Sequence, residues 1–529
     1  MGAKRCNPVQ LKRKSPLAVF LIFCGFASTS CGRVAPSGLP VESTDNAPPG
    51  PAAQLVSGKE LFGNYCAQCH GEKGDGDGPA ARFLYPRPRN FGEARFRIVS
   101  TTNFMPTDRD LLSVINHGMP GSAMFPFAHL MEQDKVALVA YVRQLEKDLL
   151  IERFRASAGA DADLAELAGD ADHLMQPGSE ISVPLEVLSP SADSIERGKQ
   201  LFQVGCVSCH GQTGKGDGVQ EQRDNAGMPI RPRDFTRGIF KGGHEPQQLY
   251  IRTVLGMPGS PMPASSQAKP SEIGDLVNFI LSLSDPASRA KAEHTRIRLT
   301  ARKSAMPLPD VISPAEWDAV GTASIVVSPL WWRNYPEPDL QVRALHDGKS
   351  IAIRLTWRDA TQNVSAARPQ DFVDMAALQL FKGSGEPFLG MGLADKGVDV
   401  WHWRAGWQQL VAQAAGMLDS YPVDFYTARA AGNLITNPER QLTAGSLAAI
   451  GFGSTTFRPK TSQLVTASST WKEGQWTVVF RRPLQAGPDD GVSLAPGGRC
   501  SIAFAIWDGE ERDRNGQKLV SIWHDLILE

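Results

Sequence analysis

The sequence lacks the features that mark several large classes of protein. Its 55 Lys and Arg are balanced by 56 Asp and Glu, so it lacks the positive field that binding to a phosphate backbone requires. No stretch after residue 27 approaches the roughly eighteen apolar residues of a membrane span. It also has neither a P-loop nor a nucleophile elbow around a serine or cysteine. These absences exclude a nucleic-acid partner, a multi-span membrane protein and the common NTPase and hydrolase sites.

Free cysteine is also scarce. Of the eight cysteines, four lie in two Cys-x-x-Cys-His motifs, and Cys6 and Cys24 lie in or before an N-terminal apolar stretch. Only Cys31 and Cys500 remain, so a disulfide-stapled scaffold is excluded and the cysteines point to cofactor attachment. We expect Cys500 to be a buried strand thiol.

The N-terminus has the charge order of an export signal. Residues 1–14 are basic with no acid, and an apolar run follows at 17–27, too short to span a membrane. We predict an export signal at 1–31, a flexible tether at 32–50 and a periplasmic protein. The segment before Cys31 resembles a lipoprotein cleavage site, with Ser28 where leucine is usual, so a lipid anchor at Cys31 and a plain soluble signal both stay open.

The 529 residues suggest three or four domains, and an internal repeat supplies two of them. Residues 58–71 reappear at 198–211, 88–91 at 232–235 and 118–124 at 256–262, and a helical apolar pattern closes each copy. We predict two modules, 51–150 and 191–290, joined by a linker at 151–190.

Each module carries a motif for covalent haem. Two thiols separated by two residues can form thioethers to the porphyrin vinyl groups, and the adjacent histidine can then ligate the iron. Zinc is the competing interpretation, but it needs two further ligands and neither module has another cysteine. The predicted thioether and proximal residues are Cys66, Cys69 and His70 in the first module, and Cys206, Cys209 and His210 in the second.

The sixth iron ligand separates an electron carrier from a catalyst, because a methionine sulfur closes the distal side. Two methionines are repeated, as Met119/Met257 and Met124/Met262. We predict Met124 and Met262, whose place before the final helix resembles the ligand loop of class I cytochromes c; Met119 and Met257 remain the alternative. Nearby arginines at 87, 89, 231 and 233 either pair with haem propionates or are solvated.

The composition and the apolar periodicity change in the last part of the chain. All eleven tryptophans lie at or after Trp317, and apolar residues alternate at 351–357, 476–480 and 502–506. We predict an antiparallel β-sandwich over 315–529, reached by a second linker at 291–314. The predicted fold class is therefore multidomain, with two small all-α cytochrome c domains followed by an all-β sandwich.

Residues 315–529 resemble the haem-binding domain of the gamma subunit of ethylbenzene dehydrogenase and related type II dimethyl sulfoxide reductase-family molybdoenzymes. The motifs that carry the resemblance lie at 374–379, 391, 400–405, 451–453, 476–481, 504–509 and 516–518. It implies a non-covalent haem b held by Met391 and Lys518. Without the resemblance, Met391 would be interpreted as a core methionine and Lys518 as a lysine in a solvated turn. His402 is an alternative ligand, because imidazole commonly binds iron. Those gamma subunits consist largely of the sandwich, whereas this chain adds two c-type modules.

The sequence thus predicts an exported electron-transfer protein with two haems c and one haem b, more a subunit than an enzyme in itself. Its expected partners are a molybdopterin catalytic subunit, an iron–sulfur subunit, and a soluble cytochrome c or membrane oxidase. One alternative is a multihaem peroxidase or nitrite reductase with an open iron. The other is a dihaem carrier whose sandwich binds carbohydrate on an exposed tryptophan platform.

Overall fold

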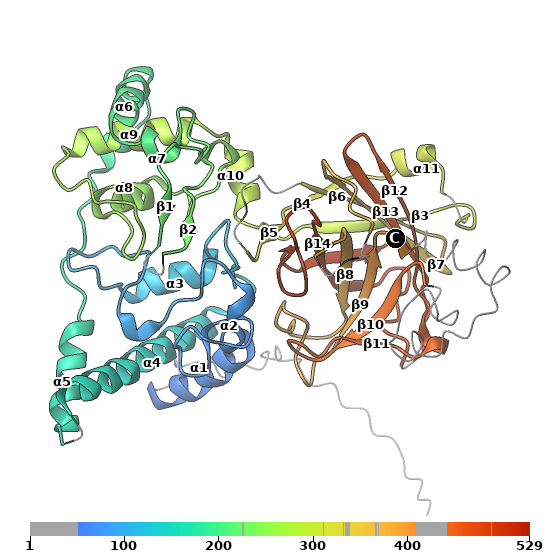
Figure 1. The fold of residues 1–529 in the computed structure, drawn as a ribbon, viewed down its shortest axis with the longest axis horizontal. Coiled ribbons are helices and arrows are strands. Elements are labelled where there is room, and N and C mark those ends of the chain that lie inside the picture. Colours follow the sequence, from blue (N-terminus) through green and yellow to red (C-terminus); the bar gives the residue numbers. More distant parts are fainter. Residues whose placement is uncertain are drawn as a thin grey trace, which may run out of the picture. The chain divides into compact units, whose positions relative to one another are not determined.

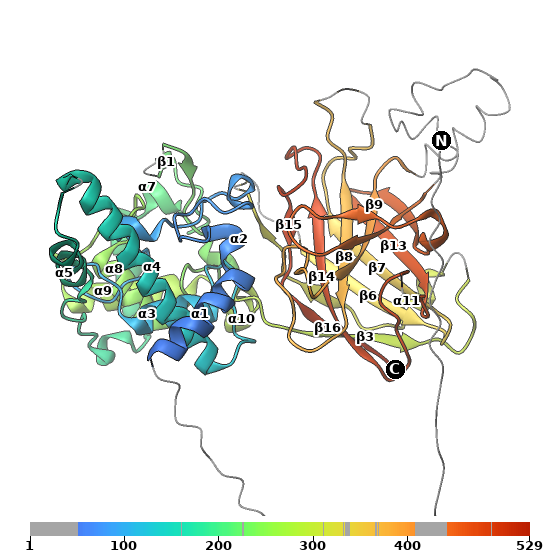
Figure 2. The same cartoon turned by 90° about the horizontal axis from the view of Figure 1, so that it is seen from below.

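The computed structural model of the protein describes residues 51–529, except 160, 225–226, 310–311, 332, 334–338, 366–367, 369, 408–441 and 488, with side chains from residue 57 onward. Helices dominate the chain as far as Ala292, and strands dominate the rest (Figures 1 and 2). This confirms the predicted fold class. The predicted export signal at 1–31, the lipid-anchor candidate Cys31 and the tether at 32–50 lie outside the described residues.

The first module is held together by the crossing of its first and last helices. These two helices meet at Gly58, where an added Cβ would lie 2.2 Å from the carbonyl oxygen of Ala137. Phe62 and Leu138 pack beside this crossing and are almost fully buried. The helices of the module are α1 (Pro51–Tyr65), α2 (Ala67–His70), α3 (Asp108–His117) and α4 (Glu132–Ala158).

The second module repeats this arrangement. Its first and last helices meet at Gly198, where an added Cβ would lie 1.9 Å from the carbonyl oxygen of Asp275. The repeated glycine therefore marks a close helix crossing in both modules. The elements of the module are α6 (Ala192–Gly205), α7 (Val207–His210), β1 (Gln222–Arg223), β2 (Pro229–Ile230), α8 (Pro246–Leu255) and α9 (Pro270–Ser282).

The segment between the modules is structured and packed. Helix α4 runs on to Ala158, and α5 (Leu164–Met175) packs against it through the buried Ala171. A short 3₁₀ helix (Leu185–Leu188) then lies against α9, where Val187 would touch a Cβ at Gly274. After α9, helix α10 (Pro286–Ala292) leads into the β domain. Within the described range, none of the helices combines the length and apolarity that crossing a bilayer requires.

The β domain is one long sheet folded onto itself. The order of its main path is β11-β10-β9-β8-β14-β16-β3-β6-β7-β13-β12. Neighbours are antiparallel except that β3 pairs in parallel with β16 and with β6. The elements are β3 (Arg298–Lys303), α11 (Pro314–Asp318), β4 (Ala323–Ile325), β5 (Ser328–Pro329), β6 (Leu340–His346), β7 (Ser350–Arg358), β8 (Met375–Phe381), β9 (Val398–Arg404), β10 (Gly445–Ala449), β11 (Thr456–Phe457), β12 (Thr466–Lys472), β13 (Gln475–Pro483), β14 (Arg499–Trp507), β15 (Leu519–Val520) and β16 (His524–Leu528).

Tryptophan contacts show that two halves of this sheet face each other. Trp403 of β9 lies 6.3 Å from the ring of Trp357 in β7 and 5.0 Å from that of Trp476 in β13. All three are at least 97% buried. The half containing β8 and β9 therefore packs on the half containing β7 and β13, which makes the domain a sandwich. Strand β3, inside the stretch expected as a linker at 291–314, belongs to this sheet.

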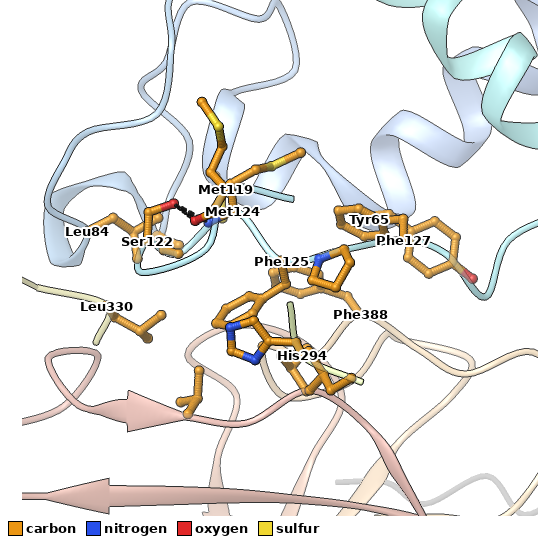
Figure 3. Close-up of a pocket in the computed structure, with 18 of the residues that line it drawn as sticks. Tyr65, Leu84, Met119, Ser122, Met124, Phe125, Phe127, His294, Leu330 and Phe388 are labelled. Atoms are coloured by element: carbon orange, nitrogen blue, oxygen red, sulfur yellow. Dashed lines mark hydrogen bonds between the residues drawn. The ribbon is translucent and has the colours of Figure 1, made fainter. Parts of the chain in front are cut away.

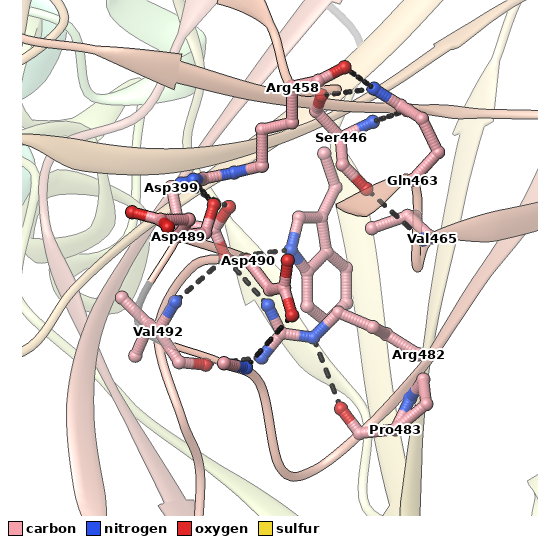
Figure 4. A network of polar contacts seen from close by, with 12 residues as sticks. Asp399, Ser446, Arg458, Gln463, Val465, Arg482, Pro483, Asp489, Asp490 and Val492 are labelled. Atoms are coloured by element: carbon pink, nitrogen blue, oxygen red, sulfur yellow. Dashed lines mark hydrogen bonds and ion pairs between the residues drawn. The ribbon is translucent and has the colours of Figure 1, made fainter. Parts of the chain in front are cut away.

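A buried ion pair lies within the sandwich (Figure 4). Asp399 of β9 accepts a 2.7 Å hydrogen bond from the guanidinium of Arg482 in β13, and both residues are at least 98% buried. Trp401 and the backbone of Val492 donate to the same carboxylate, and Arg458 lies 3.4 Å from it. Two cations and two neutral donors thus compensate one buried carboxylate.

Candidate haem sites

Each Cys-x-x-Cys-His motif forms a single helical turn. The amide of His70 donates to the carbonyl of Cys66 at 2.9 Å, and that of Cys69 donates to the same carbonyl at 3.1 Å. The turn formed by α7 has the same two bonds, at 2.9 and 3.2 Å. Residues three and four apart share one helix face, so both thiols and the imidazole of each motif lie on the same side.

The first histidine is held ready to ligate a metal as a neutral ring. Its Nδ1 lies 3.3 Å from the carbonyl oxygen of Arg89, which leaves Nε2 for a metal. The ring stacks on Phe91 with centroids 5.1 Å apart. Burial lowers the pKa of His70, although the bond to Arg89 opposes this. The neutral imidazole is the form that binds iron.

The second histidine has a similar aromatic setting, but its buried Nδ1 has no hydrogen-bond partner among the described residues. His210 stacks on Phe235 at 4.7 Å, and burial together with the charge of Lys241 lowers its pKa to about 4.

A zinc site is not supported in either module. Within the described part of the chain, the ligand atoms of neither motif gather within 4.8 Å of one another, as a shared zinc ion would require.

The two methionine loops also match. Gly118 and Gly256 have positive φ, and the amide of Met119 donates to the carbonyl of Met124 at 2.7 Å, as Met257 does to Met262 at 3.2 Å. Figure 3 shows Met119 and Met124 on one loop. Both line the same cavity as His70, so the geometry does not choose between them. Met257 is 93% buried and Met262 is less so, which favours Met262 as the more accessible sulfur.

One cavity of about 1200 Å³ joins the first module to the sandwich. From the module it is lined by Cys66, Cys69 and His70, and from the sandwich by Met391 and Lys518. All belong to one compact unit of the chain, Pro49–Glu529. A site for a single small molecule or cofactor usually measures about 300–1,000 Å³. This cavity therefore has room for more than one cofactor, and sequence patterns gave no sign that the two sites are continuous.

The sandwich wall of this cavity suits a flat macrocycle. In β8 and β14 one set of alternate residues fills the sandwich core, and the other set faces outward. An outer sheet face is usually polar, but here it is apolar and many of its side chains are small. The outward residues that line the cavity include Met375, Ala377, Val400, Leu447, Ala503 and Ala505.

The predicted haem b ligands both reach this wall. Met391 has a φ of 81°, uncommon for a residue other than glycine, and its sulfur accepts a 2.8 Å hydrogen bond from Thr455. The amine of Lys518 lies 4.7 Å from the centroid of the Trp507 ring. Burial lowers the pKa of Lys518 to about 8. Because lysine ligates a metal only as the free amine, this environment suits ligation.

The rival ligand His402 lines the same cavity. Its ring meets those of Trp407 and Trp507 edge to face, at 5.4 and 6.0 Å. Burial, aided by the charges of Arg404 and Lys518, lowers its pKa to about 4. The imidazole is therefore neutral, and His402 stays an alternative to Lys518.

Of the four arginines considered for propionate contacts, two bridge the modules reciprocally. Arg89 of the first module donates to the carbonyl of Gly259 in the second methionine loop at 3.4 Å. Arg233 of the second module packs in the same way against Gly121 of the first methionine loop. The contact is so close that an added Cβ on Gly121 would lie 2.9 Å from the Arg233 side chain. Of the other two, Arg87 pairs with the exposed Asp77, and Arg231 donates to the carbonyl of Gly216.

Two further cations at this contact were missed. Arg97 and Lys241 line the cavity together with Arg89 and Arg233. Burial and these neighbouring guanidinium groups hold the pKa of Lys241 well below its usual range. A cluster of basic side chains of this kind favours binding of an anionic group such as a haem propionate. The signal was present in the repeat, because Phe96-Arg97 in one module answers Phe240-Lys241 in the other.

Comparison with known proteins agrees with this architecture. Residues 55–146 and 195–284 match the family model described as cytochrome c. Residues 290–519 match the one described as ethylbenzene dehydrogenase. The first assignment implies covalently attached haem c in both modules.

Several relatives share part of the chain. Chlorate reductase subunit gamma of Ideonella dechloratans is 30% identical over 192 residues, which cover 35% of this chain and 64% of that protein. Dimethylsulfide dehydrogenase subunit gamma of Rhodovulum sulfidophilum is 28% identical over 189 residues, 36% of this chain and 59% of that protein. The chain thus spans less than two thirds of the length of the curated relatives it matches.

A solved structure, the reducing HAO-like protein complex of Kuenenia stuttgartiensis, contains a chain 33% identical to this one. The match covers 43% of this chain and 96% of that one, with a TM-score of 0.35. Together, the motif geometry, the sandwich and the family matches confirm the resemblance seen in the sequence: the chain consists of two cytochrome c domains followed by a haem-binding domain of the ethylbenzene dehydrogenase gamma-subunit type.

Proposed function

We propose that the protein is an exported three-haem electron-transfer subunit, with two haems c and one haem b. The observation that carries this proposal is the shared cavity. It brings the first Cys-x-x-Cys-His turn and the pair Met391 and Lys518 to one continuous space. Haem supplies one-electron redox chemistry when bound, and the protein supplies ligation, orientation and insulation from water.

The proposed ligand sets would give each iron two protein ligands. In each cytochrome domain the histidine of the motif is neutral and stacked on a phenylalanine, and a residue of the methionine loop would supply the second ligand. In the sandwich, the ligands come from two loops that flank the apolar outer wall. The sets are Cys66, Cys69, His70 and Met124; Cys206, Cys209, His210 and Met262; and Met391 with Lys518.

Contacts between the three parts of the chain support a shared electron-transfer role. The Tyr65 hydroxyl of the first module donates to the carbonyl of Glu386 in the sandwich at 3.1 Å. The ring of Phe125, next to Met124, lies 5.5 Å from that of His294 (Figure 3). The second module joins the first through the reciprocal contacts of Arg89 and Arg233. The first module therefore contacts both the sandwich and the second module, and the second module also reaches the shared cavity through Arg233 and Lys241.

We infer the partners from the relatives. Two of them are gamma subunits, of chlorate reductase and dimethylsulfide dehydrogenase. By analogy, the sandwich would serve a molybdopterin catalytic subunit and its iron–sulfur subunit. The cytochrome domains would serve a soluble cytochrome c or a membrane oxidase in the periplasm. Co-purification with a molybdenum- and iron–sulfur-containing protein tests this assembly.

The burial of tryptophan argues against the carbohydrate-binding alternative. A sugar platform needs exposed aromatic faces, whereas most tryptophans of this domain are at least 91% buried. Those buried are Trp317, Trp357, Trp401, Trp403, Trp407, Trp476, Trp507 and Trp523.

Haem stoichiometry tests the proposal directly. A pyridine haemochrome assay on the full-length protein should find two covalent haems and one extractable haem per chain. Lys518→Ala should lose or alter only the extractable haem, because it removes one axial ligand. Lys472→Ala is the matched control, since that lysine is 83% exposed on β12, and it should keep all three haems.

Other outcomes would overturn the proposal or part of it. Two haems with none extractable would refute the haem b site. Loss of the extractable haem in His402→Ala but not in Lys518→Ala would transfer the ligand role to His402. Carbon monoxide binding to the reduced protein as isolated would reveal an open iron, and would favour the peroxidase or nitrite reductase alternative.

A further inference from the structure

Three aspartates, none of them a proposed haem ligand, meet at one end of the sandwich. Asp359 follows β7, Asp374 precedes β8 and Asp508 follows β14. One carboxylate oxygen from each lies within 4.8 Å of those from the other two. The group joins both layers of the sandwich, because β7 lies in one layer and β8 and β14 lie in the other.

Part of this cluster is satisfied by hydrogen bonds. Asp374 is fully buried and accepts from the amides of Asn363 and Gly509, each at 2.8 Å, and from the Trp476 indole at 3.0 Å. Its carboxylate is thus fixed from three sides. Such donors hold it in the form that a cation would bind.

Asp359 has an oxygen with no such partner. The residue is 94% buried, and its Oδ1 accepts from the amide of Thr361 at 3.0 Å. Its Oδ2 is buried and has no hydrogen-bond partner among the described residues. Burying a carboxylate oxygen without a hydrogen-bond donor or a cation costs free energy. The unpaired Oδ2 of Asp359 therefore indicates a cation-binding position.

The charges of the described residues around the cluster do not compensate it. Among the described residues, the ion pairs of this region involve one cation, Arg333, which pairs with Asp513 and lies 3.9 Å from Asp508. Glu511 adds a further half-buried carboxylate nearby. The buried Asp399 differs, because Arg482 and Arg458 neutralise it (Figure 4).

The electrostatic consequence is a raised pKa at two of the three carboxyls. Burial, followed by the charges of Asp374 and Asp508, raises the pKa of Asp359 to about 7. Burial raises the pKa of Asp374 to about 6, despite its three donors. A bound divalent cation would relieve the desolvation and the repulsion together.

We propose that Asp359, Asp374 and Asp508 form a calcium site. Calcium binds oxygen ligands at about 2.3–2.6 Å, so ligand atoms around one ion lie up to about 5 Å apart, as these do. Thr361 and Asn363 bring further oxygen atoms to the same turn. The donor set is all oxygen, which excludes the soft sites of zinc and copper. Magnesium keeps several of its waters, whereas calcium accepts a buried cage.

The site would brace the wall of the haem cavity. Asp374 and Asp508 directly adjoin Met375 and Trp507, which pair across β8 and β14 and line that cavity. A cation there would tie these strands to the end of β7 in the opposite layer. The proposal does not depend on which residues ligate haem.

Metal content and thermal unfolding of the full-length, haem-loaded protein test this site. After chelation and dialysis against calcium, the wild type should hold one calcium per chain. All tryptophans lie at or after Trp317, so tryptophan fluorescence reports on unfolding of the sandwich. Calcium at a hundred times its Kd should raise that Tm by about 5–10 °C, and magnesium should not.

Variants separate binding from general stability. Asp359→Asn should lose the bound calcium and the Tm shift, and the half-buried Asp508→Asn gives the same test if the first variant does not accumulate. Asp399→Asn is the matched control, a buried carboxylate of the same domain, which should lower the Tm but keep the full calcium shift. A wild type without calcium or without the shift, an equal shift with magnesium, or an unchanged shift in Asp359→Asn would overturn the proposal.

Discussion

The repeated glycines at the helix crossings allow a sharp test of how each cytochrome domain is packed. Gly58→Ala in α1 would place a methyl carbon 2.2 Å from the carbonyl oxygen of Ala137 and 2.8 Å from Cβ of Tyr141. Neither neighbour is the flexible end of a side chain, so α1 has to move away from α4. Gly198→Ala makes the equivalent clash in the second domain, at 1.9 Å from the carbonyl of Asp275.

The size of the effect follows from two opposing terms. Overpacking of this kind destabilises by about 1–3 kcal/mol. Alanine returns up to about 1 kcal/mol, because it favours the helix over glycine. With the full return from alanine the net loss is up to about 2 kcal/mol, which for a domain of this size lowers the Tm by up to about 16 °C. Gly63→Ala, in the same helix, is exposed and meets nothing within 4 Å, so it should raise the Tm.

Thermal unfolding of the full-length haem-loaded protein, followed through the haem Soret absorbance, measures both effects. Gly58→Ala should lower the transition of the first domain and leave that of the second in place. Gly198→Ala should do the reverse. If Gly58→Ala proved as stable as Gly63→Ala, the helix crossing would not be the reason for the glycine.

Two other predictions concern the sandwich. Arg482→Met leaves the buried Asp399 without its 2.7 Å partner and should lower the free energy of unfolding by about 3–5 kcal/mol. Urea denaturation measures this loss. A loss below about 1 kcal/mol would contradict the stabilising role of the ion pair. Burial lowers the pKa of His294 to about 4, so between pH 6.5 and 4 the unfolded chain binds a proton that the folded chain excludes. Stability should therefore fall by about 2 kcal/mol from pH 6.5 to pH 5, and His294→Gln should flatten this slope; parallel pH curves would refute the assignment.

The features predicted from the sequence are those governed by local spacing. The Cys-x-x-Cys-His turn needs only residues three and four apart, and the structure forms it at both places. The alternation at Ile502, Phe504 and Ile506 identified the face that fills the sandwich core, and these residues are 98–100% buried. Local periodicity suffices here, because one face of a strand is set by every second residue.

The features that sequence reasoning missed depend on distant pairing. Strand β3 was read as linker because its buried positions, Leu299 and Ala301, are too few to form a pattern, and its partners β6 and β16 come much later in the chain. The calcium candidate was equally hidden. Its aspartates occur singly at three strand ends, and only the folding of the sheet brings them together.

The outer face of β8 and β14 is apolar and has to be covered. A sandwich ordinarily hides one face of each sheet and leaves the other to water. Here Ala377, Ala503 and Trp507 on the outward side are at least 93% buried. Loops of the first module contribute to this burial, since Phe83 meets Phe452 with rings 5.9 Å apart and would touch a Cβ on Gly516. The proposed haem against that wall and the cytochrome domain beyond it would together cover the second apolar face of this sheet.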